Sequence, residues 1–197
     1  MGNKCVVVFV GPSGIGKTSN ARLLSRRFNF ARSICITTSP PWDDDDEECC
    51  RYVDKVTFLQ MIKRNQFIEW DQYGDNFYGT TWESIRLCDK PDCPGLVICS
   101  SPAGYPQIKS NLENVIGISL LPESGDIAWL NKKLKDRGTN SPDDIEVRTK
   151  ILESYIHETK NLELPTVYLG YEPETWERAF TEIIEIIKQA GFKISDR

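Results

Sequence analysis

Eight residues near the N-terminus have the types and spacing that binding a nucleoside triphosphate requires. Residues 11–18 read Gly-Pro-Ser-Gly-Ile-Gly-Lys-Thr, which is the pattern G-x-x-x-x-G-K-[ST]. Glycines in such a loop let successive backbone N–H groups approach phosphate oxygens, because no Cβ stands in the way. Lys17 can reach the outer phosphates as a point charge, and the Thr18 hydroxyl can coordinate Mg²⁺. The predicted nucleotide-binding residues are Gly11, Ser13, Gly14, Gly16, Lys17 and Thr18, with Thr18 as the metal ligand.

The flanking residues supply the setting that this loop needs. Residues 5–10 form an unbroken apolar run, which is typical of a buried parallel strand. Leu23, Leu24 and Phe28 follow the loop at helical spacing. A strand, a glycine loop and a helix in this order favour a phosphate-binding loop over an ordinary glycine-rich turn.

The rest of the chain alternates short apolar strands with amphipathic helices. Strands are expected at residues 5–10, 34–37, 96–100, 115–120 and 166–169. The alternation predicts an α/β fold in which helices flank both faces of a parallel sheet.

Composition and charge exclude several classes of protein. The 197 residues are 40% hydrophobic, enough for one compact domain, and no apolar run approaches the roughly 20 residues of a membrane helix. Seven cysteines without C-x-x-C or zinc-ligand spacing indicate a reduced, cytoplasmic setting. The net charge of −5 arises from the six acidic residues 43–48, because 24 basic residues otherwise face 23 acidic ones. This local acidity argues against nucleic-acid binding, and we expect no membrane association.

Five segments in order along nearly the whole chain resemble the guanylate kinase family. The third and fourth are the specific ones, and the third reads Phe-Leu-Gln-Met-Ile-Lys-Arg-Asn-Gln-Phe-Ile-Glu-Trp at 58–70, then Tyr-Gly-Asp-Asn-Phe-Tyr-Gly-Thr at 73–80. It is similar to the family's F-x-x-M-I-x-x-G-x-F-I-E-x segment ending in G-N-x-Y-G-T. The other segments are residues 11–18, 35–38, 134–148, and the terminal strand and helix.

This resemblance implies the P-loop nucleoside monophosphate (NMP) kinase fold, with ATP as co-substrate and Mg²⁺ as cofactor. A single domain would comprise a core (1–32, 96–122 and 151–197), an NMP-binding module (33–95) and a lid (123–150). The reaction implied is phosphoryl transfer from ATP to a nucleoside monophosphate, by default GMP or dGMP. Arg137 and Arg148 match the lid arginines, which with Lys17 would neutralise charge on the transferring phosphoryl group.

The resemblance also assigns the residues that hold the acceptor nucleotide. Glu69 matches the carboxylate that accepts hydrogen bonds from guanine N1 and N2. Tyr78 matches a phosphate-contacting tyrosine and Thr80 a base-contacting hydroxyl, at what we expect to be a turn over residues 78–80. We expect Thr38 to line the same pocket.

The chain departs from the family where the acceptor phosphate docks. The two phosphate-binding arginines of the family fall on Ser39 and Trp42, its phosphate-binding tyrosine near Cys50, and its Asp-x-Asp on Cys99 and Ser101. Two charge-assisted hydrogen bonds contribute about 3–6 kcal/mol, or roughly 10²- to 10⁴-fold in affinity. Three cations flank the gap and can substitute: Arg32, Arg51 and Lys55.

Three hypotheses about function follow. The first is an ATP-dependent guanylate kinase, the second a nucleotide-binding regulatory or scaffold module with little or no GMP kinase activity, and the third a kinase with a changed acceptor. Residues 43–48 are interpreted as a solvated loop, a docking site for a cationic protein partner, or a gate against GMP. Trp42, at an arginine position, can stack on a base.

Overall fold

A parallel sheet of five strands forms the centre of the molecule. The computed structural model describes residues 4–41, 50–123, 127–136 and 142–195, apart from the side chains of 133–136 and 142–149. The sheet has the order β2-β7-β1-β8-β9 and every pairing in it is parallel. Its strands are β1 (Cys5–Val10), β2 (Ala31–Arg32), β7 (Gly95–Ser100), β8 (Val115–Pro122) and β9 (Thr166–Leu169).

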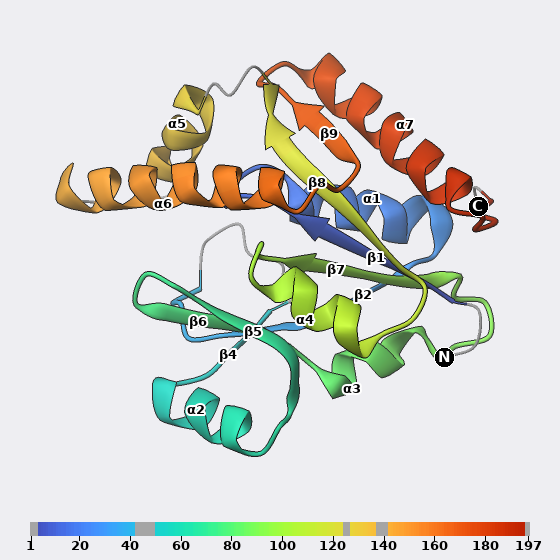
Figure 1. Ribbon diagram of the computed structural model, residues 1–197, viewed down its shortest axis with the longest axis horizontal. Helices are drawn as coiled ribbons and strands as arrows, with labels where there is room; N and C mark the ends of the chain where they lie inside the picture. The colour runs from blue at the N-terminus through green and yellow to red at the C-terminus, as the bar shows by residue number, and fades with distance from the viewer. Residues whose placement is uncertain (1–3, 42–49, 124–126, 137–141, 196–197) are drawn as a thin grey trace.

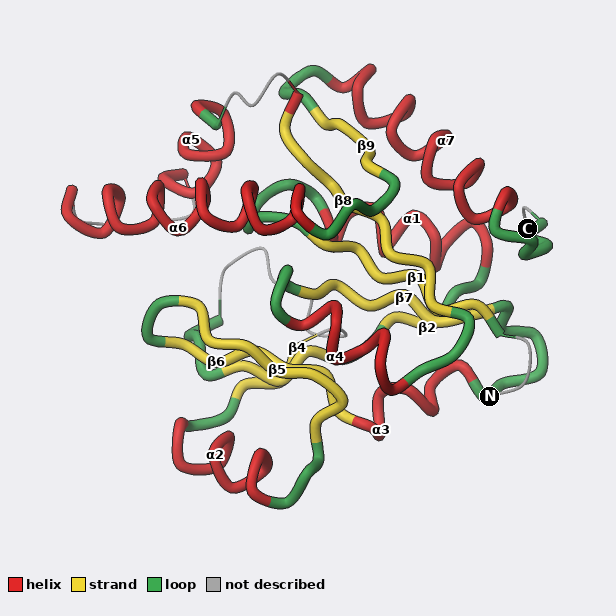
Figure 2. The backbone as a smooth tube through the Cα atoms, viewed as in Figure 1, coloured by secondary structure: helices red, strands yellow, loops and turns green. Residues whose placement is uncertain are grey.

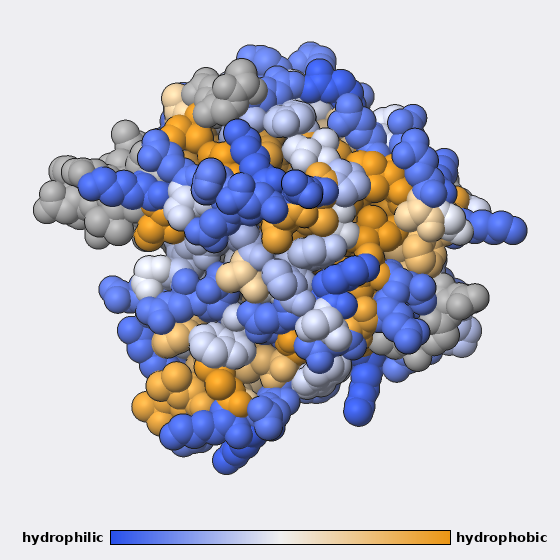
Figure 3. Space-filling model, viewed as in Figure 1, coloured by the Kyte–Doolittle hydropathy of each residue, from blue (hydrophilic) through white to orange (hydrophobic). Residues whose placement is uncertain are grey.

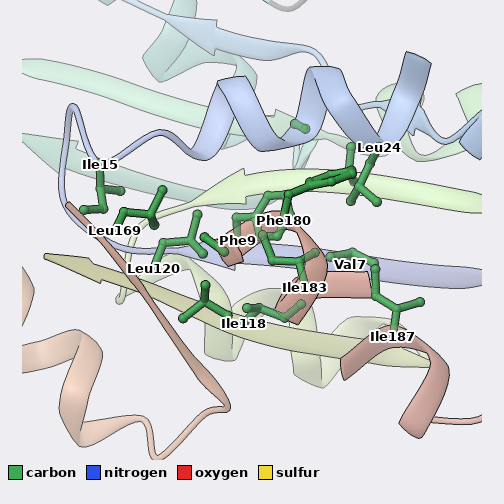
Figure 4. Packing of buried hydrophobic residues seen from close by; sticks show 14 of the residues in the cluster. Val7, Phe9, Ile15, Leu24, Ile118, Leu120, Leu169, Phe180, Ile183 and Ile187 are labelled. Carbon is green, nitrogen blue, oxygen red and sulfur yellow. The ribbon is translucent and has the colours of Figure 1, made fainter. Parts of the chain in front are cut away.

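Helices cover both faces of this sheet, as Figures 1 and 2 show. The helices α1 (Lys17–Phe28) and α7 (Pro173–Gln189) enclose one apolar cluster, which Figure 4 shows around Phe9, Ile118 and Phe180. The helix α4 (Gly104–Asn111) covers the opposite cluster, to which Val8 and Ile98 contribute. Strand β1 contributes side chains to both clusters, so the phosphate loop leaves a strand that is buried on each side.

A second sheet of four strands forms the lower lobe in Figure 1. Its order is β4-β3-β6-β5, comprising β3 (Cys35–Thr37), β4 (Cys50–Tyr52), β5 (Phe67–Tyr73) and β6 (Asn76–Thr81). Strands β3 and β4 are parallel, whereas β6 is antiparallel to both of its neighbours, β3 and β5.

The assignment of residues 34–37 to the parallel sheet is wrong. The chain leaves that sheet after β2, where the Ser33 N–H still donates to the carbonyl oxygen of Val97 at 2.9 Å. Strand β3 then pairs with β4 and β6 instead, and β2 takes the edge of the core. The expected turn at residues 78–80 is also wrong, because these residues lie inside β6.

The helix α2 (Lys55–Lys63) supports one face of the second sheet. Phe58 is fully buried and stacks on Phe67 and Phe77, with ring centroids 4.5 and 5.4 Å apart. Asp54 caps this helix by accepting a hydrogen bond from the Thr57 N–H at 2.8 Å. With α2 on one face, the opposite face of the sheet, which carries Glu69, is turned toward Ser100 of β7 and the start of α4 in the core.

Two further helices, α5 (Ala128–Asp136) and α6 (Pro142–Asn161), lie beside the end of β8 in Figure 1. Short helices α3 (Trp82–Ile85) and η1 (Arg86–Cys88) connect β6 to β7. Figure 3 shows an apolar area over α2, where Val56 and Leu59 are exposed. Among the helices of the described residues, none is long and apolar enough to cross a lipid bilayer.

Candidate phosphoryl-transfer site

The predicted phosphate loop joins the carboxyl end of β1 to the first turn of α1. Gly16 precedes the helix with φ at +107°, in the left-handed region, and no side chain caps the helix. A Cβ at Gly16 would lie 2.4 Å from the Trp176 ring, so this position has room only for glycine. The uncapped N–H groups of α1 therefore face the loop, where an anion can accept their hydrogen bonds.

Lys17 lies folded over the loop that it is predicted to serve. Its Nζ donates to the carbonyl oxygens of Gly11 at 2.7 Å and Pro12 at 2.9 Å. Ser13 and Gly14 lie in the same loop and are half-buried, while Thr18 is exposed on the first turn of α1. The predicted donor-binding residues thus occupy one continuous loop and helix start.

Asn20 is a structural residue of the loop that the sequence reasoning missed. Its side chain is fully buried, and its Nδ2 and its backbone N–H both donate to the carbonyl oxygen of Gly16 at 3.0 Å. The Oδ1 atom of Asn20 has no hydrogen-bond partner among the described residues. The available signal was a polar side chain on the helix face that also carries Leu24 and Phe28.

The described part of the structure includes the side chain of neither predicted lid arginine. Arg137 lies outside the described residues. Arg148 lies in α6, and its side chain is outside the description. Their catalytic roles therefore stay predictions.

Strand register brings Glu69, Thr80 and Tyr78 onto one face of the second sheet. Glu69 pairs with Thr80, and Asp71, two residues further along β5, pairs with Tyr78. Because directly paired residues point to the same face, these four side chains form two adjacent rows. Cys35 extends the first of these rows across β3, where it pairs with Thr80.

Glu69 is a buried carboxyl group held between the two sheets. It is 5% exposed, and the Ser100 hydroxyl donates to its Oε2 at 3.5 Å. Gly104, at the start of α4, lies so close that a Cβ there would stand 2.4 Å from Oε2. Burial raises the pKa of Glu69 to about 7; hydrogen bonds from Thr80 and Ser100 oppose this rise, and the charge of Asp71 adds to it. Ser100 and Gly104 were missed from the sequence, because only the fold brings them to Glu69.

Thr38 directly follows β3, and its predicted place in the acceptor pocket stays a prediction. Its hydroxyl accepts a hydrogen bond from the Phe77 N–H at 2.9 Å and donates to Asn76 Oδ1 at 3.3 Å. It thus fastens the start of β6, whereas its neighbour Thr37 pairs with Tyr78 and shares that row. Thr37 is 3% exposed and is the threonine that register brings to the ligand face.

Among the described residues, the region predicted to bind the acceptor phosphate contains Ser39 and the thiol of Cys50. Ser39 is buried, its hydroxyl donates to the Pro40 carbonyl oxygen, and its N–H donates to the Thr37 hydroxyl. Trp42 and the acidic run 43–48 lie outside the described residues. Cys50 pairs with Cys35 across β3 and β4, which continues the row that begins at Glu69.

The three candidate replacement cations lie on different elements, and Arg32 is half-buried on β2, where it pairs with Val97 of β7. Burial raises the pKa of the Cys99 thiol to about 11, and the positive charges of Lys17 and Arg32 oppose this rise. Arg51 pairs with Ile36, on the face turned toward α2. Lys55 is exposed at the start of α2.

The described residues contain no group of histidine, cysteine and carboxylate side chains that could hold a metal ion. A groove of about 720 Å³ lies at the outer edge of β9 and contains none of the predicted site residues. Its lining includes Leu121, Ile156, Lys160, Tyr168, Arg178 and Glu182.

The parallel core, the phosphate loop at its centre and the inserted second sheet together define a P-loop nucleoside monophosphate kinase. A family model described as guanylate kinase matches residues 3–169. The chain therefore belongs to the guanylate kinase family, as the sequence motifs predicted.

Similar proteins agree with this assignment over most of the chain. A guanylate kinase of Bordetella pertussis is 31% identical over 194 residues, which cover 98% of this chain and 86% of that protein. One of Nitrosomonas europaea is 31% identical over 185 residues, covering 92% of this chain and 89% of its own. The crystal structure of guanylate kinase from Anaplasma phagocytophilum superposes with a TM-score of 0.65 at 20% identity, covering 96% of this chain and 87% of that one. This likeness confirms the predicted fold.

Proposed function

We propose that this protein is an ATP-dependent kinase that transfers the γ-phosphoryl group of ATP to GMP or dGMP. The observation that carries the proposal is a buried carboxyl group, Glu69, on the same sheet face as Thr80 and Tyr78, in a chain of the guanylate kinase family. The intact loop at 11–18 supports the donor half of the reaction.

ATP binding, the donor half of the reaction, requires Lys17 to change its hydrogen-bond partners. Its ammonium group donates to two loop carbonyls, Gly11 and Pro12, and can turn from them to the outer phosphates of ATP. The Thr18 hydroxyl is exposed beside it and fits a Mg²⁺ ligand, since hard oxygen donors suit this ion. When bound, Mg²⁺ supplies positive charge that offsets the negative charge of the phosphates.

The acceptor half rests on the hydrogen-bonding pattern of guanine. An ionised Glu69 accepts from guanine N1–H and the 2-amino group, two donors that adenine does not present at this edge. Adenine instead directs the lone pair of N1 at the carboxylate. With adenine bound, the buried negative charge of Glu69 would therefore have no hydrogen-bond donor from the base. Thr80 lies directly opposite in the β-ladder and provides a hydroxyl for the same base.

The acceptor phosphate is assigned to Tyr78 and Arg32, and the charge of the transferring phosphoryl group to Arg137 and Arg148 of the lid. This assignment keeps the division into a core, an NMP-binding module at 33–95 and a lid at 123–150. Lid closure excludes water, so that the phosphoryl group passes to the nucleotide rather than to solvent. We place the reaction in the cytoplasm. Any role of residues 43–48 toward a cationic partner lies outside the described residues.

A coupled assay across the common ribo- and deoxynucleoside monophosphates tests the proposal. We expect turnover with GMP and dGMP, loss of turnover in Lys17→Ala, and a selective loss of guanine nucleotide use in Glu69→Gln. ATP binding by calorimetry accompanies each variant. ATP binding without product from any monophosphate would refute the kinase and favour a nucleotide-binding regulatory module. A preference for a pyrimidine or adenine nucleotide would refute the choice of acceptor alone.

A further inference from the structure

The helix that carries Arg148 also contacts the second sheet directly. Tyr155 lies in α6 and its hydroxyl donates to Oδ2 of Asp71 on β5 at 2.9 Å. The Tyr155 ring packs edge-on against Tyr73 of the same strand, with centroids 5.2 Å apart and planes at 90°. The hydroxyl bond and the ring contact together join two elements that are 84 residues apart in the chain.

The strand end of this contact lies within the acceptor site. Asp71 follows Glu69 by two residues on β5 and pairs with Tyr78 on β6. Successive alternate residues of a strand point to one face, so Asp71 stands beside the base-binding carboxyl group and opposite the predicted phosphate-binding tyrosine. A group that fixes Asp71 therefore acts on the face where the acceptor nucleotide binds.

The helix end of the contact is firmly anchored. Leu152 is fully buried and Ile156 is 8% exposed in the main apolar cluster, so the turns on either side of Tyr155 are held by the core. The Thr159 hydroxyl donates to the Tyr155 carbonyl oxygen at 2.6 Å, which stiffens the next turn. Burial raises the pKa of the Tyr155 phenol, and the Asp71 charge raises it further, so the phenol stays protonated and remains a donor.

Seven residues separate positions 148 and 155 in α6. Two helical turns span about 10 Å, and residues seven apart lie along the same side of a helix. The contact at Tyr155 therefore fixes the backbone of α6 against β5 at a point two turns from position 148.

We propose that the Tyr155–Asp71 contact is a latch between α6 and the acceptor module, and that Tyr155 is a positioning residue that holds Asp71 in place beside Glu69 and Tyr78 on the acceptor face. The proposal rests on the GMP kinase function proposed above. It identifies a connection between acceptor binding and the lid helix that does not pass through the nucleotide. Tyr73 supports the latch by holding the phenol ring at the correct angle.

The latch is tested by a double-mutant cycle in the full chain. Tyr155→Phe removes the hydroxyl and keeps the ring contact with Tyr73, whereas Asp71→Ala removes the acceptor. We expect each single variant to lower kcat/KM for GMP by about tenfold with the KM for ATP unchanged, as the loss of one hydrogen bond to a charged group predicts. At pH 8.5, where Glu69 is ionised with or without the Asp71 charge, the double variant should lose no more than either single one, because both then remove the same interaction.

Tyr168→Phe is the matched control, since Tyr168 is 45% exposed on β9 and lines a groove that contains none of the predicted ATP-binding or acceptor-binding residues. Hydrogen exchange of β5 and β6 amides, with and without GMP, provides a readout that needs no turnover. Faster exchange in Tyr155→Phe but not in Tyr168→Phe supports the latch even if GMP is bound without being phosphorylated. Exchange and kcat/KM equal to those of Tyr168→Phe, or losses in the two single variants that multiply in the double variant, would overturn it.

Discussion

Below about pH 7, protonation of Glu69 should control how well the acceptor nucleotide binds. Guanine donates two hydrogen bonds to the ionised carboxylate, whereas the protonated carboxyl group presents an O–H to one of those donors. With the pKa of free Glu69 at about 7, roughly half of the sites are ready for guanine at pH 7. At pH 6 the ready fraction is about one tenth, so kcat/KM for GMP should fall by a factor approaching ten for each further pH unit.

The stability of the free protein should change with pH in the opposite direction from GMP binding, falling as the pH rises. A pKa of about 7 in the folded state, against an ordinary value of 4.5, means that the folded protein binds the Glu69 proton more tightly than the unfolded chain. The contribution of this group to stability is therefore complete below pH 4.5 and is lost as the pH rises through 7. The pKa difference corresponds to about 3 kcal/mol for this buried group, and bound GMP offsets it by pairing the charge.

The assay is kcat/KM for GMP and for ATP from pH 5.5 to 8.5, with Glu69→Gln as the reference. The GMP phosphate itself titrates near pH 6, and the Gln variant reports that titration alone. Calorimetry in two buffers of different ionisation enthalpy should detect release of about half a proton when GMP binds at pH 7. A GMP profile that follows the Gln variant across this range, or an equal loss for ATP, would refute the assignment of Glu69 as the base-binding carboxylate.

Three other substitutions test separate parts of the site. Gly16→Ala should weaken ATP binding in calorimetry by at least about 100-fold, because φ is +107° and the new Cβ meets the Trp176 ring; wild-type affinity would contradict this geometry. Arg32→Ala should raise the KM for GMP by about 10- to 100-fold without changing the KM for ATP, with Arg51→Ala as the unaffected control in the coupled assay. Phe58→Ala should cost about 3–5 kcal/mol in denaturant unfolding, because the fully buried ring supports the sheet from below; a loss under 1 kcal/mol would argue against that packing.

The sequence predicts the strand, glycine loop and helix around residues 11–18 correctly because their determinants are local. The run 11–18 contains its own turn-forming glycines, its lysine and its helix start, and each occupies the position expected from the pattern. The assignment of residues 34–37 failed for the converse reason. A three-residue apolar strand has the same pattern in either sheet, and its partners are set by pairing with residues 50–52 and 78–80, far along the chain.

In the acceptor site, residue spacing in the sequence does not determine burial or strand register. Glu69 was identified from its motif, yet its raised pKa depends on burial against Ser100 and Gly104, which arrive from another sheet and another helix. Thr38 was expected in the pocket from the family resemblance, and strand register places its neighbour Thr37 in the row of Tyr78. Such one-residue differences decide which side chain meets a ligand, and they are fixed by register.

The two faces of the second sheet divide stability from recognition, and this division explains how the acceptor half can differ from its family. Phe58 and the aromatic rings around it hold one face, so the opposite face can change its polar residues without losing the sheet. On that face lie Glu69 and Thr80, the predicted base-binding pair, and Cys50 continues their row at the place where the resemblance puts a phosphate-binding tyrosine. We therefore predict that positive charge for the phosphate comes from outside this sheet, from Arg32 on β2 and from the lid arginines. A lid helix that supplies a larger share of the charge needs a fixed approach to the sheet, and the bond from Tyr155 to Asp71 provides a fixed point beside the base.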